Sequence, residues 1–138
     1  MEAMCAPEVV QPPPSSLPAG ERLRELLLAF TDGIANSDSI HLYRAIVAEA
    51  GRMPGLGHLL WDTGYQPLRA AITQLLTEEL GTAPAPIVAQ QIVHLTLGDA
   101  YQELILGTGS PGPEVFERQI DAALALLGLA PEGARFGQ

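Results

Sequence analysis

Few residues of this chain have the types and spacing that catalysis needs. The three histidines, His41, His58 and His94, lie far apart, and no glutamate stands three residues before any of them. An HExxH zinc motif and the ExxH pairs of a di-iron bundle are therefore both missing. The single Cys5 permits neither an internal disulfide nor a cysteine-based zinc site. We expect no metal, no cofactor and no enzyme activity.

Residues 107–112 match GxGxxG letter for letter. A phosphate-binding loop of that form needs a strand before it and a helix N-terminus within it. Here a helical pattern precedes the glycines and Pro111 stands among them. We interpret the segment as a loop between two helices.

Composition excludes several partners. The chain has 138 residues, of which 47% are hydrophobic and 17% charged, so part of its surface is expected to meet a partner or a small molecule. The net charge is -9, and all seven basic residues are scattered arginines. Binding nucleic acid or an anionic membrane needs clustered cations, so we expect neither from this chain alone. Without a signal-peptide pattern or a transmembrane run, a cytoplasmic protein is expected.

The chain divides into one domain and two flanking segments. Residues 1–18 are rich in proline and read as a disordered arm or linker. Residues 19–130 carry the helical patterns of one domain, and residues 131–138 read as a flexible tail.

Apolar residues recur at helical spacing in the first two segments of the domain. Residues 21–35 place Leu23, Leu27, Phe30 and Ile34 on one stripe. A second helix begins at Ser37 or Asp38, either of which can cap it, and ends at Gly51.

We predict one bent helix over residues 54–80, because its apolar stripe passes through Gly64 and Pro67 without losing phase. The residues 86–107 are predicted to form one helix that is apolar on two sides and thus buried between two layers. A last helix covers residues 113–129. No alternating strand pattern occurs, so the predicted fold is an all-α bundle of five helices.

The joint between the second and third helices is unusually short. Gly51 is expected to end one helix in a left-handed turn, and Pro54 suits the first turn of the next. Such a joint keeps the two helices adjacent, which places Tyr43 and Val47 near the stripe that contains Trp61.

Residues 42–56, LYRAIVAEAGRMPGL, are followed eight residues later by Gly64. This run resembles the C-terminal domain of TetR-type transcriptional regulators, where a run such as LYR.VVAEA.RFP.L is common. Ala89-Gln90-Gln91 and residues 95–98 fit the penultimate helix of that family. The likeness covers roughly residues 20–130.

The resemblance implies a sensor domain with a small-molecule cavity, which dimerises through its last two helices in a four-helix bundle. It implies DNA binding only through a separate N-terminal domain. A small apolar effector is expected, because few charges are available to line a pocket. The candidate ligand-binding residues are Phe30, Tyr43, Val47, Trp61, Gln91 and His94. The candidate dimer residues are Leu97, Tyr101, Leu104, Phe116, Ile120, Leu124 and Leu127.

Other interpretations remain open at this point. His94 and the aromatic candidates are equally consistent with core positions. The domain is also consistent with a structural helical homodimer without a ligand, or with a partner that heterodimerises with a full-length regulator.

Overall fold

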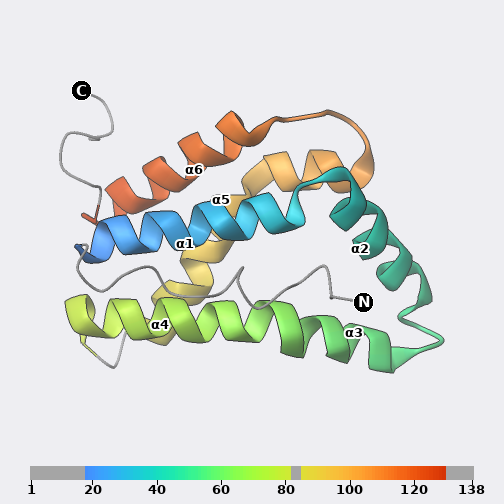
Figure 1. Cartoon of the computed structure of the whole chain (residues 1–138), viewed down its shortest axis with the longest axis horizontal. Coiled ribbons are helices and arrows are strands. Elements are labelled where there is room, and N and C mark those ends of the chain that lie inside the picture. Colours follow the sequence, from blue (N-terminus) through green and yellow to red (C-terminus); the bar gives the residue numbers. More distant parts are fainter. Residues whose placement is uncertain (1–17, 82–84, 130–138) are drawn as a thin grey trace.

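The computed structural model describes residues 18–81 and 85–129, and every regular element in these two ranges is helical. The elements are α1 (Ala19–Ile34), α2 (Ser37–Glu49), α3 (Pro54–Leu60), the π-helical turn η2 (Trp61–Tyr65), α4 (Gln66–Leu80), α5 (Ala85–Leu106) and α6 (Pro113–Leu126). Because α3, η2 and α4 follow one another without a gap, the described residues form five helical rods, as predicted (Figure 1). The interpretations of residues 1–17, which include Cys5, and of residues 130–138 fall outside the described ranges.

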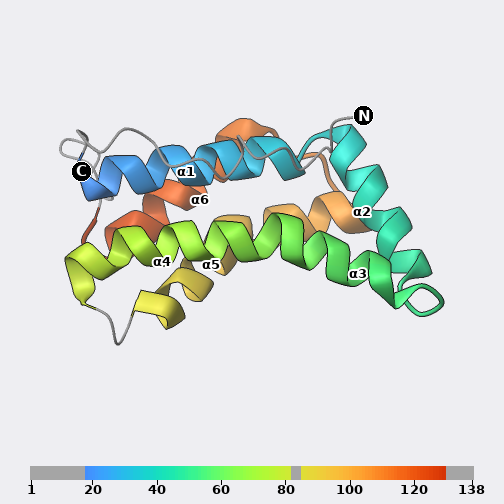
Figure 2. The same ribbon diagram turned by 60° about the horizontal axis from the view of Figure 1, so that its bottom comes forward.

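Four of the rods pack around one core. α1 lies between α6 and α4, and α5 crosses behind α1 from the end of α4 toward α2 (Figures 1 and 2). α2 covers the end of the bundle where α1 stops and α3 begins.

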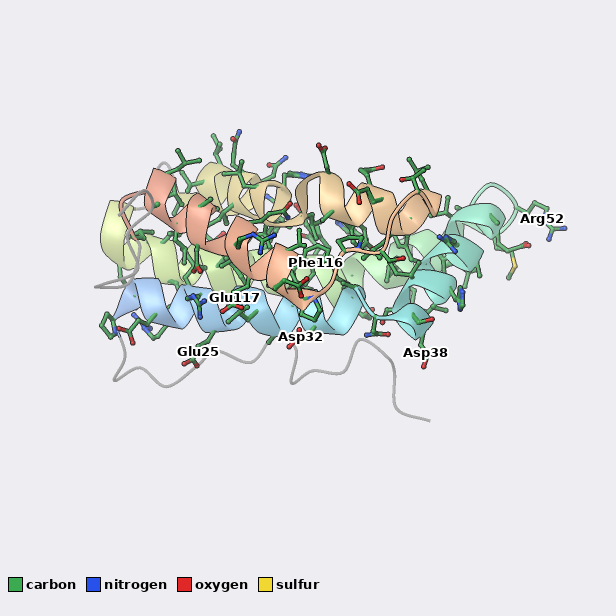
Figure 3. The ribbon with its side chains drawn as sticks, turned by 90° about the horizontal axis from the view of Figure 1, so that it is seen from above. Glu25, Asp32, Asp38, Arg52, Phe116 and Glu117 are labelled. Carbon is green, nitrogen blue, oxygen red and sulfur yellow. The ribbon has the colours of Figure 1, made fainter. Side chains whose placement is uncertain are left out.

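The predicted stripe of the first helix forms one wall of the core. Leu23, Leu26, Leu27 and Phe30 are all buried. Glu25, Asp32 and, on α2, Asp38 lie on the outer side of the bundle, whereas Phe116 lies between α6 and the layer beneath it (Figure 3). Burying one such leucine stabilises the fold by about 1.5–3 kcal/mol, so this face is enough to fix how α1 docks.

The single bent helix over residues 54–80 is confirmed, and its bend has a local cause. Pro67 has no N–H to donate, and its ring crowds the preceding turn. The wider π-helical turn η2 stands directly before it and relieves that crowding. Beyond the turn, Leu68 and Ile72 are fully buried, whereas Trp61 within it is 47% exposed.

The predicted helix over residues 86–107 is confirmed as α5, but it is not continuous. Gly98 has φ 50° and ψ −156°, which breaks α5 into two halves. The first half buries Ala89, Ile92, Val93 and Thr96, and the second half buries Ala100. Among the apolar residues of α5, Ile87, Leu95 and Leu106 are exposed, so the helix is not buried between two layers within this chain.

Two details of the helix ends also differ from expectation. The cap of α2 is Asn36, whose side chain accepts from the Ser39 amide at 2.9 Å, rather than Ser37 or Asp38. Gly51 does not have a positive φ. The amides of Arg52 and Met53 both donate to the Glu49 carbonyl, which turns the chain without a left-handed residue. Pro54 does open α3, and α2 packs against α3 as expected.

Candidate functional site

A small pocket lies at the end of the bundle where α1, α2, α3 and α5 meet. Its volume is about 40 Å³. The residues that line it are Gly33, Ile34, Ser39, Leu42, Tyr43, Ile46, Leu60 and Tyr101. Most of these side chains are apolar, and a cavity that takes up benzene measures about 150 Å³. In this shape the pocket fits only a few atoms.

Two tyrosines and one serine supply the polar groups of the pocket. The rings of Tyr43 and Tyr101 meet edge to face, with centroids 6.0 Å apart. The Ser39 hydroxyl donates to the Gly33 carbonyl at 2.6 Å, which joins the start of α2 to the end of α1. Apolar walls with a few polar groups are typical of sites for small, mainly apolar molecules.

Arg44 holds the end of α5 beside the pocket, and sequence reasoning missed this role. Its Nη2 donates to the Leu104 carbonyl at 2.6 Å and its Nε to the Ile105 carbonyl at 2.8 Å. The last carbonyls of a helix lack partners within the helix, and a cation there also favours the helix dipole. The one sequence feature that pointed to this role was the position of the arginine directly after Tyr43 in the LYR run.

One side chain of α6 donates hydrogen bonds to α5 beside the break. Gln119 Nε2 donates to the Thr96 carbonyl at 2.6 Å and to the Leu97 carbonyl at 3.1 Å. A Cβ on Gly98 would lie 3.0 Å from Gln119 Oε1, so glycine is needed both for its backbone angles and for this close approach.

Of the six candidate ligand residues, Tyr43 lines the pocket. Phe30 is buried in the core, and Val47 and Trp61 are exposed on the outer surface. Gln91 and His94 are exposed on α5. The structure therefore places these five side chains apart from the pocket lining, whereas Leu42, Ile46 and Leu60 belong to it.

The seven candidate dimer residues divide by burial. Phe116, Ile120 and Leu124 are buried within the chain's own core, so their side chains are not open to a second chain. Leu97, Tyr101, Leu104 and Leu127 are half-buried. The exposed apolar residues of α5 and α6 are instead Ile87, Leu95, Leu106 and Leu126.

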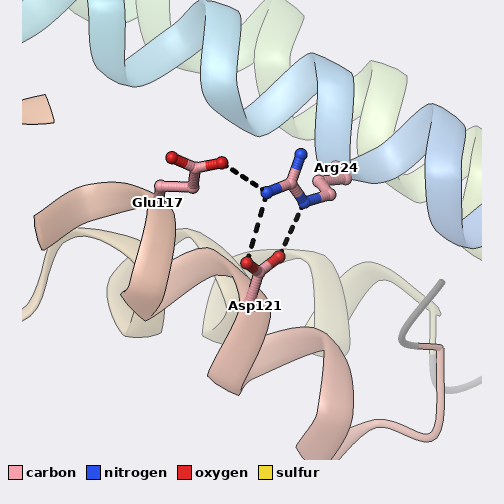
Figure 4. Close-up of polar contacts among 3 residues, drawn as sticks. All are labelled: Arg24, Glu117 and Asp121. Carbon is pink, nitrogen blue, oxygen red and sulfur yellow. Dashed lines mark hydrogen bonds and ion pairs between the residues drawn. The ribbon is translucent and has the colours of Figure 1, made fainter. Parts of the chain in front are cut away.

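Two ion pairs from one arginine join α1 to α6 (Figure 4). Arg24 Nε donates to Asp121 Oδ1 and Nη2 to Glu117 Oε2, each at 2.7 Å, and Nη2 also donates to Asp121 Oδ2 at 3.2 Å. The hydrogen bond to Asp121, followed by that to Glu117, raises the pKa of the Arg24 guanidinium, although partial burial opposes the shift.

The described ranges contain neither a metal-binding cluster nor a membrane-spanning helix. No group of three or more histidine, cysteine, aspartate or glutamate side chains there is placed to hold a metal ion. No helix in the same ranges is long and apolar enough to cross a membrane.

Comparison with known proteins identifies the family. The model of the AefR-like transcriptional repressor C-terminal domain matches residues 21–127, and it describes regulators rather than enzymes. A crystallised chain from Mesorhizobium loti MAFF303099, described as a TetR-family transcriptional regulator, matches with a TM-score of 0.65 and 24% identity. That match covers 86% of this chain and 62% of the other, and at this identity it shows the fold alone. No curated protein matches. Since the family model spans most of the sequence, the chain belongs to the TetR family of transcriptional regulators, as a C-terminal domain of the AefR-like type.

Proposed function

We propose that this domain senses a small apolar molecule in the pocket between α1, α2, α3 and α5. The observation that carries the proposal is the lining itself: apolar side chains from α1, α2 and α3 surround two phenol rings, one from α2 and one from α5. Charged side chains do not take part in the lining, so a neutral or mainly apolar ligand suits it best.

The pocket must widen to accept such a molecule, and α2 is suited to move. Ile40 is the one residue of α2 that is fully buried, whereas Leu42 and Val47 are exposed. Helices with few buried contacts open at low free energy. In a complete regulator, occupancy would then shift the packing of the domain and alter the separation of two DNA-reading heads.

The test is a thermal-shift screen with small hydrophobic compounds and two matched variants. Ile46→Trp fills the pocket, whereas Val47→Trp adds the same ring one residue later, at a position 56% exposed. We expect a compound that raises the melting temperature of the wild type and of Val47→Trp but not of Ile46→Trp. A compound that stabilises Ile46→Trp equally binds elsewhere, and no stabilising compound in the screen would favour a purely structural dimer.

We also propose that the domain forms a homodimer through the outer faces of α5 and α6. On α5, Ile87, Gln91, His94 and Leu95 are exposed at helical spacing. On α6, Arg118, Ala122 and Leu126 follow one another at intervals of four, with Arg118 and Leu126 exposed and Ala122 half-buried. A second copy would cover Leu95 and Leu126, which the packing of a single chain leaves exposed to water. A cytoplasmic location remains part of this proposal.

A further inference from the structure

α2 and the second half of α5, residues 99–106, are joined as one outer wall of the pocket. Arg44 of α2 donates two hydrogen bonds to the end of α5, at Leu104 and Ile105. The ring of Tyr43 on α2 meets the ring of Tyr101 on α5. Because of these contacts, we expect a displacement of α2 to displace residues 99–106 as well, and the reverse.

This wall is attached to the rest of α5 at Gly98, whose backbone conformation is accessible essentially to glycine alone. In an uninterrupted helix the Thr96 carbonyl would accept from the amide of Ala100, four residues on. Here Gln119 Nε2 from α6 donates to that carbonyl instead. Gln119 Nε2 also donates to the Leu97 carbonyl, which in an uninterrupted helix would accept from the amide of Tyr101. Both carbonyls therefore have a donor in either arrangement, so the difference in hydrogen-bond energy at these two groups is small.

The straight arrangement would nevertheless move the wall outward. The first half of α5 buries Ala89, Ile92 and Thr96 on one face. If the helix continued without a break, Asp99, Ala100 and Glu103 would extend this face, three, four and seven residues after Thr96. Since burying two carboxylates is costly, residues 99–106 would have to leave the core and take Tyr101 away from the pocket.

We propose that Gln119 is a positioning residue that holds the outer wall of the pocket against α6. Its two hydrogen bonds, to the Thr96 and Leu97 carbonyls, are called the latch below. When the latch is closed, Tyr101 stands in the pocket, and when it is released, α2 and residues 99–106 open together. The inference rests on the proposed ligand site, since a volume of about 40 Å³ must grow before a molecule of benzene size enters. It also links that site to α6, one of the two helices of the proposed dimer.

Amide hydrogen exchange followed by mass spectrometry on the full chain, without ligand, tests the latch. Gln119→Glu keeps the size of the side chain but removes the Nε2 donor, and Gln119→Met removes the donor without adding charge. In both variants we expect exchange of residues 37–49 and 99–106 to speed up about three- to tenfold, the factor that loss of one hydrogen bond supplies. Gln90→Glu, the same change at an exposed position in the first half of α5, should leave exchange unchanged.

The exchange rate of α2 is the decisive measurement. A purely local role of Gln119 would speed exchange in residues 96–102 and leave the exchange rate of α2 unchanged. Faster exchange in α2 with unchanged α1 and α4 supports the latch. An unchanged α2, or the same acceleration in every helix, overturns it. Because no ligand is present, this result is independent of the compound screen: a failed screen removes the proposed ligand site, whereas an unresponsive α2 removes the latch.

Discussion

Tyr43 and Arg44 are neighbours in the sequence, and they contact the second half of α5 in different ways. Successive helical residues point about 100° apart, so Tyr43 lines the pocket while Arg44 reaches the end of α5. Helical periodicity identified Tyr43 as inward-facing. It could not identify Arg44, because the partners of that side chain are backbone carbonyls some sixty residues away in the sequence.

Thr96 is fully buried, and its hydroxyl has no hydrogen-bonding partner in the described part of the chain. An unpaired buried hydroxyl costs about 1–3 kcal/mol, and valine has nearly the same shape without it. We therefore expect Thr96→Val to raise the free energy of unfolding by about 1 kcal/mol in urea denaturation.

Thr31 provides the matched control, since it is also buried but its hydroxyl donates to the Leu28 carbonyl at 3.1 Å. Thr31→Val removes a bond that exists, and it should be neutral or destabilising by about 1 kcal/mol. Equal effects of the two substitutions would show that the Thr96 hydroxyl is satisfied in solution.

At the scale of elements, apolar periodicity was a reliable guide where a helix packs against one layer. The stripes of α1 and α4 are buried as their spacing indicates. The break in α5 could not be predicted in this way, because the helical spacing of its apolar residues continues past residue 98. Glycine permits both a helical and a non-helical backbone, so residue 98 alone carries no sign of which conformation is adopted.

Arg24 is predicted to hold α1 against α6. Arg24→Met removes the hydrogen bonds to Asp121 and Glu117 and leaves these two carboxylates facing each other across one turn. Since Arg24 remains 27% exposed, we expect a loss of about 1 kcal/mol in the free energy of unfolding, measured by urea denaturation.

Arg52→Met is the control, because Arg52 is 78% exposed and pairs only with Glu49 of its own helix end among the contacts described. It should change stability by no more than about 0.5 kcal/mol. The difference between the two variants should shrink in molar salt. Because the pKa of Arg24 is raised, its contribution is complete below the ordinary pKa of arginine and is lost only as the pH rises through the raised value. Alkaline pH up to about 10 should therefore leave the contact intact.

At the scale of the whole molecule, the proposed dimer uses the outer face of α5 and α6. We expect Leu95→Glu, at a position 44% exposed, to convert a dimer to a monomer in sedimentation velocity runs. A charge placed at the centre of an apolar interface is left without water and without a partner.

Leu59→Glu makes the same change on α3, at a position 60% exposed, and should leave the dimer intact. Wild-type protein that sediments as a monomer at high micromolar concentration would refute the dimer. Dissociation by Leu59→Glu and not by Leu95→Glu would move the interface to the opposite end of the molecule.

The sequence by itself determined the helices, their inward faces and the family, because these depend on spacing within a short stretch and on the LYRAIVAEAGRMPGL run. Tertiary structure decided the break at Gly98, the bonds of Gln119 and Arg44, and the lining of the pocket. The physical reason is that each of these depends on atoms from separate helices. A glycine takes whichever backbone its neighbours satisfy, and a cavity is the volume that several packed helices fail to fill.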